Sequence, residues 1–266
     1  MNQEEVKKPT TPVSKGDLKA GLQRLGLTKG DNIGVHSSIS SFGYVEGGAD
    51  TVIDALLEVI SKEGTIVMPT HSANLEKVER SLEEIVAGVS WLYKILPYDP
   101  HKTPCTTGTI PETFRKRKDV LRSLHHVHSI AATGSKAKAI VKAGNINVLD
   151  AWKQLLENNG YILLLGVDLG TCTAMHLAEA RVTFPNHILE KITPPKWFVE
   201  KYPADQWEWD VGPYPAFAKM EHPCLKHKIM KTAIVGEATL KLVKLKDLLD
   251  VYEKHLKEDP DPFYTT

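Results

Sequence analysis

Hydrophobic positions recur along the chain with two periods, one typical of helices and one of strands. Leu18, Leu22 and Leu25 have helical spacing and follow Ser14, a residue type that caps helix N-termini. Similar patterns predict further helices over 49–62, 109–118, 148–158, 171–184 and 246–257. Short apolar runs predict strands at 32–36, 65–68, 161–165 and within 232–243.

The order of these elements predicts the fold class. Strand 32–36, the helix over 49–62 and strand 65–68 form a βαβ-type unit, which is typical of a layered α/β core. The run 161–165 is apolar and uncharged, as expected of a central strand covered on both faces. We therefore expect an α/β protein with a layered mixed sheet flanked by helices.

Two stretches interrupt this pattern and suggest how the domain is organised. Residues 70–108 contain clustered prolines and predict an irregular insertion or long functional loop. Residues 185–230 are rich in Pro and Trp and predict a smaller, variable lobe for the substrate. We expect residues 1–13 to be a flexible tail and residues 14–266 to form a single domain.

Composition excludes several classes of function. Lys and Arg together number 33, as do Asp and Glu, so no overall charge favours nucleic acid or an anionic membrane. No apolar run reaches the length of a membrane-spanning helix, and residues 1–16 lack the apolar core of a signal peptide. The three cysteines are far apart and odd in number, which is unlike a disulfide framework. A reducing, cytoplasmic location is expected.

The signatures of P-loop nucleotide hydrolases, dinucleotide-binding proteins, zincins and serine hydrolases are all absent from the sequence. A different feature stands out after the first strand, in the stretch VHSSISSFGYVEGG at 35–48. Its hydroxyls and backbone amides precede a helix N-terminus and could contact an anion or an amide-rich ligand. The alternative is a solvated polar turn.

A second candidate feature, GVDLGTCTAMHLAEA, follows the apolar strand at 161–165. Ligands of open α/β sheets bind at the carboxyl ends of strands. On the predicted helix, His176 and Glu179 are three residues apart and share a face, so the carboxylate could orient the imidazole as a general base. Cys172 would lie on the same side and could act as a nucleophile. The alternative is an ordinary packed histidine.

Two further clusters have less specific chemistry. His125, His126 and His128 lack ligand spacing with a carboxylate or cysteine, so we predict polar pocket lining and no metal site. The segment WFVEKYPADQWEWD combines aromatic rings with acids, a composition that suits a cationic sugar. A packed aromatic lobe with solvated acids is the alternative. From composition, the candidates for binding substrate ammonium groups are Asp99, Trp209, Asp210 and Glu221.

Four collinear stretches resemble the aminoglycoside N3-acetyltransferase family. They are the segment from VHSSIS to MPTHS at 35–72, YDPHKTPCTTGTIPETFR at 98–115, RSLHHVHSIAATG at 122–134 and TAMHLAEAR at 173–181. The resemblance implies transfer of an acetyl group from acetyl-CoA, as co-substrate, to the 3-amino group of a 2-deoxystreptamine aminoglycoside. It also implies a polycationic aminosugar as partner, with the protein as a monomer or homodimer.

The resemblance also implies roles for individual residues. His176 is expected to be the general base, supported by a carboxylate. The family usually has an Asp where Gly170 stands here, so Glu179, Asp168 and Glu221 all remain candidates for that acid. The residues expected to line the coenzyme A site are His36, Ser37, Ser38, Ile39, Ser40, Ser41, Phe42, Gly43, Thr107, Thr109, Ser129 and Ile130.

We expect direct attack of the substrate amine on the thioester, with backbone N–H groups stabilising the oxyanion. Three alternatives stay open from the sequence. The first is transfer through an acetylated Cys172, the second is acylation of a non-antibiotic amine, and the third is a ligand-binding scaffold without turnover.

Overall fold

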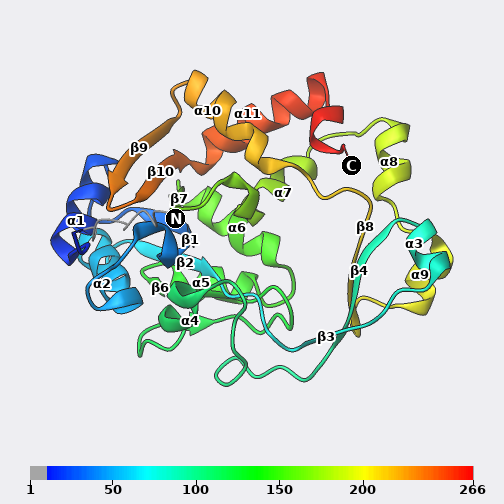
Figure 1. The fold of residues 1–266 in the computed structure, drawn as a ribbon, viewed down its shortest axis with the longest axis horizontal. Coiled ribbons are helices and arrows are strands. Elements are labelled where there is room, and N and C mark those ends of the chain that lie inside the picture. Colours follow the sequence, from blue (N-terminus) through cyan, green and yellow to red (C-terminus); the bar gives the residue numbers. More distant parts are fainter. Residues whose placement is uncertain (1–10, 266) are drawn as a thin grey trace, which may run out of the picture.

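The computed structural model describes residues 11–265, and these form a mixed sheet of seven strands with a second, three-stranded sheet beside it (Figure 1). The seven strands are, in spatial order, β5 (Leu121–Arg122), β6 (Ile130–Gly134), β2 (Thr65–Pro69), β1 (Asn32–Ser37), β7 (Tyr161–Leu165), β10 (Ala238–Lys244) and β9 (Met230–Val235). Strands β2, β1 and β7 run parallel at the centre, whereas the outer strands pair antiparallel. The predicted α/β class with a mixed sheet is confirmed.

Helices cover both faces of the large sheet because the strands present apolar side chains to both. One face packs against α1 (Lys15–Arg24), α2 (Gly48–Ile60) and α4 (Thr109–Phe114). The other packs against α5 (Ala137–Ala143), α6 (Val148–Glu157), α7 (His176–Glu179), α10 (Glu221–Lys226) and α11 (Leu245–Glu258). Strand β7 is buried from Ile162 to Leu165, as its uncharged run predicts.

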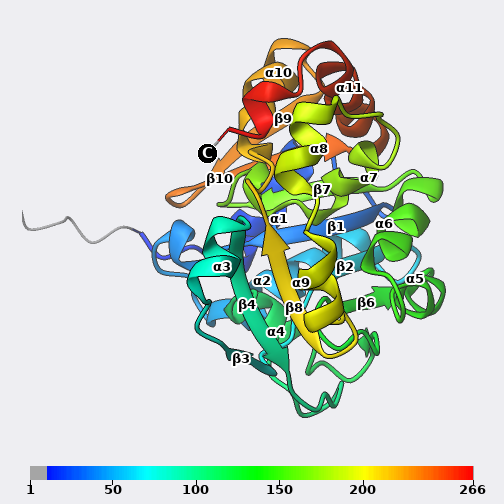
Figure 2. The same ribbon diagram turned by 90° about the vertical axis from the view of Figure 1, so that its right-hand side faces the viewer.

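The smaller sheet joins two segments that are far apart in the sequence. It consists of β3 (Leu75–Lys77), β4 (Val89–Ile95) and β8 (Trp207–Val211), with α3 (Leu82–Val86), α8 (Asn186–Ile192) and α9 (Lys196–Lys201) nearby (Figure 2). The prediction that residues 70–108 are irregular is therefore wrong. Strand β4 does not alternate regularly between buried and exposed positions, so its sequence carries little strand signal. It is held in place by pairing with β8, and nothing in the local sequence indicates this distant partner.

Two other predicted elements differ in detail. The stretch predicted as one strand pattern within 232–243 is a hairpin of β9 and β10. The predicted tail at 1–13 falls mainly outside the described residues, but Val13 is already buried and pairs with Val45. Among residues 11–265, no helix combines the length and the apolar character needed to cross a membrane.

Candidate active site

His176 lies beyond the carboxyl end of β7, where the chain makes a series of tight turns. The predicted continuous helix over 171–184 is wrong. Residues Leu169–Thr171 and Thr173–Met175 form two 3₁₀ turns, and only His176–Glu179 forms a single α-helical turn. The capping hydrogen bond from the Gly170 amide to the Asp168 side chain favours this tight turn over a longer helix.

His176 and Glu179 contact each other directly. His176 Nδ1 lies 2.6 Å from Glu179 Oε2, as their spacing of three residues predicts. The second carboxylate oxygen of Glu179 accepts hydrogen bonds from the hydroxyls of Tyr252 (3.2 Å) and Tyr264 (2.5 Å). Burial and the Glu179 charge raise the pKa of both tyrosines, which therefore act as neutral donors. The carboxylate is held in place from both sides.

This arrangement determines which of the two ring nitrogens of the neutral imidazole carries the hydrogen. Because the Glu179 carboxylate accepts a hydrogen bond from Nδ1–H, the Nε2 atom of neutral His176 carries the lone pair. Nε2 lies 2.9 Å from the hydroxyl of Tyr214, which donates to it. The His176 ring also packs edge-to-face against Phe217, with centroids 4.8 Å apart. The His176 side chain is 25% exposed, so a ligand that displaces the Tyr214 hydroxyl can reach Nε2.

The other two candidate acids are placed elsewhere. Asp168 is exposed and its side chain accepts the Gly170 amide at 2.8 Å. Glu221 forms an ion pair with Lys241 at 2.7 Å and accepts the Leu169 amide at 3.1 Å. Both acids therefore stabilise the turns that lead to His176, whereas Glu179 is the acid in contact with the imidazole.

Cys172 is fully buried in the core on the α6 side of the large sheet. Desolvation raises the pKa of its thiol to about 12. A protonated, buried thiol is a poor nucleophile, so the geometry does not favour an acetylated Cys172.

The serine-rich loop lies beside the turns that carry His176. Its first part, Ile39–Phe42, is a 3₁₀ turn that follows β1, the neighbour of β7. The Ser38 amide donates to the Leu165 carbonyl at 2.9 Å, and the Ser41 hydroxyl donates to the Gly166 carbonyl at 2.7 Å. Gly166 has φ +70°, and a Cβ there would lie 2.4 Å from Ser41. Glycine at 166 therefore allows the loop and the turn to approach closely.

Several buried polar atoms near the ends of β1 and β2 have no partner among the described residues. They are His36 Nε2, Ser37 Oγ, His71 Nε2 and Trp152 Nε1. His36 stacks on Trp152 with centroids 5.7 Å apart, and burial lowers the pKa of His36 to about 4. Unpaired buried polar groups are rare in folded proteins, so these atoms are candidates to bind a polar ligand or water.

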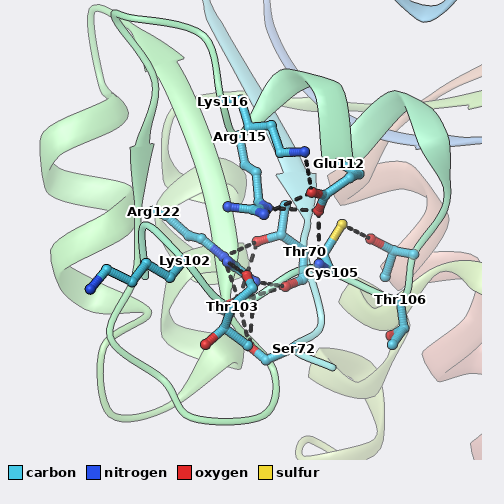
Figure 3. Close-up of polar contacts among 12 residues, drawn as sticks. Thr70, Ser72, Lys102, Thr103, Cys105, Thr106, Glu112, Arg115, Lys116 and Arg122 are labelled. Atoms are coloured by element: carbon cyan, nitrogen blue, oxygen red, sulfur yellow. Dashed lines mark hydrogen bonds and ion pairs between the residues drawn. The ribbon is translucent and has the colours of Figure 1, made fainter. Parts of the chain in front are cut away.

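Of the other residues expected at the coenzyme, Ser129 contacts Arg122. The Arg122 guanidinium lies in a polar network with Thr70, Ser72 and Thr103 (Figure 3). The Arg122 guanidinium donates to Ser129 Oγ (3.1 Å) and to the carbonyls of Thr70 (2.8 Å) and Thr103 (2.5 Å). The Thr107 hydroxyl donates to the Pro69 carbonyl at 2.7 Å. Ile130 is fully buried in β6, and Thr109 is the first residue of α4. Arg122 thus ties together the segments after β2 and before β6.

The predicted substrate residues are spread over two regions. Asp210 lies on β8, where burial raises the pKa of its carboxyl group and the nearby charge of His176 lowers it. Trp209 donates its indole N–H to the Tyr202 carbonyl and packs on Phe198, inside the smaller lobe. Asp99 is turned towards its own loop and accepts the amides of His101 and Lys102. The structure thus brings Asp210, but neither Trp209 nor Asp99, towards His176.

No group of three or more potential metal ligands occurs within residues 11–265. His128, one of the three clustered histidines, instead contacts Glu208 on β8 at 2.8 Å.

A sequence model of the family described as aminoglycoside 3-N-acetyltransferase matches residues 35–257 of the chain. The chain belongs to this family. The matched range contains the serine-rich loop, the Arg122 network and the His176–Glu179 pair.

Relatives of the family align over most of the chain. The aminoglycoside N(3')-acetyltransferase-like protein YokD of Bacillus subtilis is 32% identical over 94% of both chains. Its crystal structure superposes with a TM-score of 0.74, at 30% identity, over 95% of this chain and 96% of that one. Aminoglycoside N(3)-acetyltransferase VIII of Streptomyces fradiae is 30% identical over 70% of this chain and 67% of its own. AAC-IIIb, solved with CoASH, shares the fold at a TM-score of 0.71 and 23% identity, over 96% of this chain and 99% of that one.

Sequence reasoning missed the four aromatic residues that surround the His176–Glu179 pair, namely Tyr214, Phe217, Tyr252 and Tyr264. They come from β8–α10, α11 and the C-terminal turn, far along the chain from His176. No local spacing connects these residues to it. The packing of α11 against α7, and of the turn Phe217–Met220 against the turn Leu169–Thr171, brings them together.

Proposed function

We propose that the protein transfers an acetyl group from acetyl-CoA to the 3-amino group of a 2-deoxystreptamine aminoglycoside, with His176 as general base and Glu179 as its supporting acid. Family membership supports the reaction. The observation that carries the residue assignment is the His176 Nδ1–Glu179 Oε2 contact of 2.6 Å at the carboxyl end of β7.

The steps follow from this geometry. His176 Nε2 takes a proton from the substrate amine as its nitrogen attacks the thioester carbonyl. Glu179 stabilises the resulting imidazolium, which then gives the proton to the departing coenzyme A thiolate. Glu179 keeps its orientation throughout because Tyr252 and Tyr264 donate to its other oxygen.

For the donor, the proposed site is the serine-rich loop from His36 to Gly43 together with the segments that Arg122 holds. AAC-IIIb, which has the same fold, was solved with CoASH. The unpaired polar atoms of His36 and Ser37 suit the amide groups of a pantetheine arm. For the acceptor, we propose that Asp210 and Glu208 on β8 bind ammonium groups.

The test is release of free thiol from acetyl-CoA in the presence of a panel of deoxystreptamine sugars. His176→Ala is expected to lower turnover by about 10²–10⁴-fold, the usual contribution of a general base, and to leave acetyl-CoA binding intact. His227→Ala, at the exposed position directly after α10, is the matched control. Wild-type turnover by His176→Ala would exclude His176 as the base.

A second candidate is acylation of an amine that is not an antibiotic. It is favoured by the alignment with YokD, an acetyltransferase-like protein, which extends over more of the chain than that with the Streptomyces fradiae enzyme. Thiol release with simple polyamines, and none with any deoxystreptamine sugar, would support this alternative. Cys105, Cys172 and Cys224 carry free thiols, which fits a cytoplasmic location, and we propose a monomer or homodimer there.

A further inference from the structure

The hydroxyl of Tyr214 occupies the atom that the proposed mechanism needs free. It lies 2.9 Å from His176 Nε2 and donates to the lone pair that must accept the proton of the substrate amine. A tyrosine hydroxyl ionises well above neutral pH, so the Tyr214 hydroxyl remains a neutral donor. In this state His176 cannot take a proton from water or from an amine.

The backbone around Tyr214 is fixed, whereas its side chain has room to move. Pro213 and Pro215 restrict the backbone on both sides. The Gly212 amide donates to the Gly88 carbonyl and the Ala216 amide donates to the Phe263 carbonyl, both at 2.9 Å. In contrast, Tyr214 is 55% exposed.

The Tyr214 ring touches the site by its edge only, against His176 and Phe217 with centroids 5.5 and 6.0 Å apart. A rotation of the side chain can therefore free Nε2 without moving the loop.

We propose that Tyr214 determines which nucleophile reacts, because its hydroxyl holds His176 Nε2 until the amine of the bound acceptor displaces it. This inference rests on the proposed function of His176. Without the hydroxyl, a water molecule could take its place on Nε2. The water oxygen would then attack the thioester carbon, its proton would pass to Nε2 and on to the departing sulfur, and the products would be acetate and coenzyme A thiol.

A polycationic acceptor can displace Tyr214, whereas water has no comparable binding energy. The carboxylate of Asp210 lies close enough to interact with the charges of both Tyr214 and His176. An ammonium group bound there brings the neighbouring amine to Nε2, and the cost of breaking one hydrogen bond is offset by the charge contacts. The binding energy of the correct substrate thus opens the site.

The experiment compares Tyr214→Phe with the wild-type protein in acetyl-CoA alone and with acceptor. The variant keeps the ring and its edge contacts. Acceptor-free thiol release is expected to rise about fivefold, the factor that corresponds to one ordinary hydrogen bond. With saturating acceptor, kcat should change by less than this factor, because the bound acceptor has already displaced the hydroxyl in the wild-type protein. Tyr161→Phe, at the opposite end of β7, makes the same chemical change away from the site and should alter neither rate.

Two results would overturn the proposal. One is unchanged acceptor-free thiol release in Tyr214→Phe. The other is a loss of acceptor-dependent turnover by about 100-fold, which would instead make the hydroxyl an obligatory proton carrier.

Chemical modification of His176 does not depend on turnover, so it tests the role of Tyr214 independently of the proposed acetyl transfer. The rate at which diethyl pyrocarbonate modifies His176, followed by peptide mass spectrometry, should increase in Tyr214→Phe because Nε2 loses its partner. If the wild-type protein acetylates no aminosugar but this rate still rises, the proposed acceptor is wrong and the Tyr214 contact stands. If the modification rate is unchanged, the hydroxyl does not protect Nε2.

Discussion

Glu179 is one of three carboxylates that the sequence offers as partners of His176, and their environments differ in kind. Glu179 receives two tyrosine hydroxyls on the oxygen that does not face His176. Glu221 instead neutralises Lys241, which is only 17% exposed. A carboxylate that is held by neutral donors keeps its negative charge available to the imidazole, whereas one that is paired with an ammonium group does not.

This difference predicts opposite outcomes for two isosteric variants. Glu179→Gln removes the charge that orients and stabilises the imidazolium, so kcat should fall by about two to four orders of magnitude. Glu221→Gln leaves that pair intact but deprives Lys241 of its partner, so it should cost about 1–3 kcal/mol of unfolding free energy. Steady-state kinetics and urea denaturation of both variants test the assignment. A large loss of kcat in Glu221→Gln alone would contradict it.

At the scale of elements, the buried carboxylate of Glu84 joins α3, which packs beside the smaller sheet, to the C-terminal end of α9. Glu84 accepts the Ser81 amide (2.8 Å), the Tyr202 hydroxyl (2.6 Å) and the Lys201 ammonium (2.9 Å). These hydrogen bonds outweigh the desolvation of Glu84 and lower the pKa of its carboxyl group to about 2. Because α3 has only five residues, this contact rather than helix propensity holds it against the sheet.

Glu84→Ala is therefore expected to destabilise the smaller lobe by about 1–3 kcal/mol, the scale of leaving the buried Tyr202 hydroxyl without its partner. Chemical denaturation measures the loss, and limited proteolysis should cut first within residues 185–211. Glu83→Ala, at the neighbouring exposed position, is the control. Equal stability of the two variants would show that the Glu84 contacts are not needed.

At the scale of the whole molecule, three histidines that are withdrawn from water make the fold sensitive to acid. Burial lowers the pKa of His36 and of His125 to about 4, and burial with nearby histidines lowers that of His71 to about 3. Their ordinary pKa is near 6.5. Above that pH the folded and unfolded chains bind equal numbers of protons at these sites, and below it the unfolded chain binds more.

The free energy of unfolding should therefore fall as the pH drops from about 6.5 towards 4, by at most about 1.4 kcal/mol per pH unit for each such histidine. His71→Gln removes one titrating group and should make this slope shallower. His227→Gln, at an exposed position, should leave it unchanged. Thermal or urea denaturation across this pH range provides the measurement, and identical slopes for the wild-type protein and His71→Gln would rule out a contribution from His71.

The sequence alone determined the features that depend on neighbouring residues. The periods of apolar residues predicted the βαβ unit and the buried β7, and the spacing of three residues predicted the contact between His176 and Glu179. Local spacing suffices there because one helical turn brings those side chains together. The same reasoning failed where strand formation depends on a distant partner, as in β4, which needs β8.

Only the tertiary structure decided which of the three acids contacts His176 and which residues surround the pair. Tyr252 and Tyr264 follow Glu179 by 73 and 85 positions, and Tyr214 follows His176 by 38. Contacts over such separations arise when α11 and the C-terminal turn pack on α7, and no periodic pattern encodes that docking. The chain thus specifies the contact between His176 and Glu179 locally, whereas the hydrogen bonds around this pair depend on the packed fold.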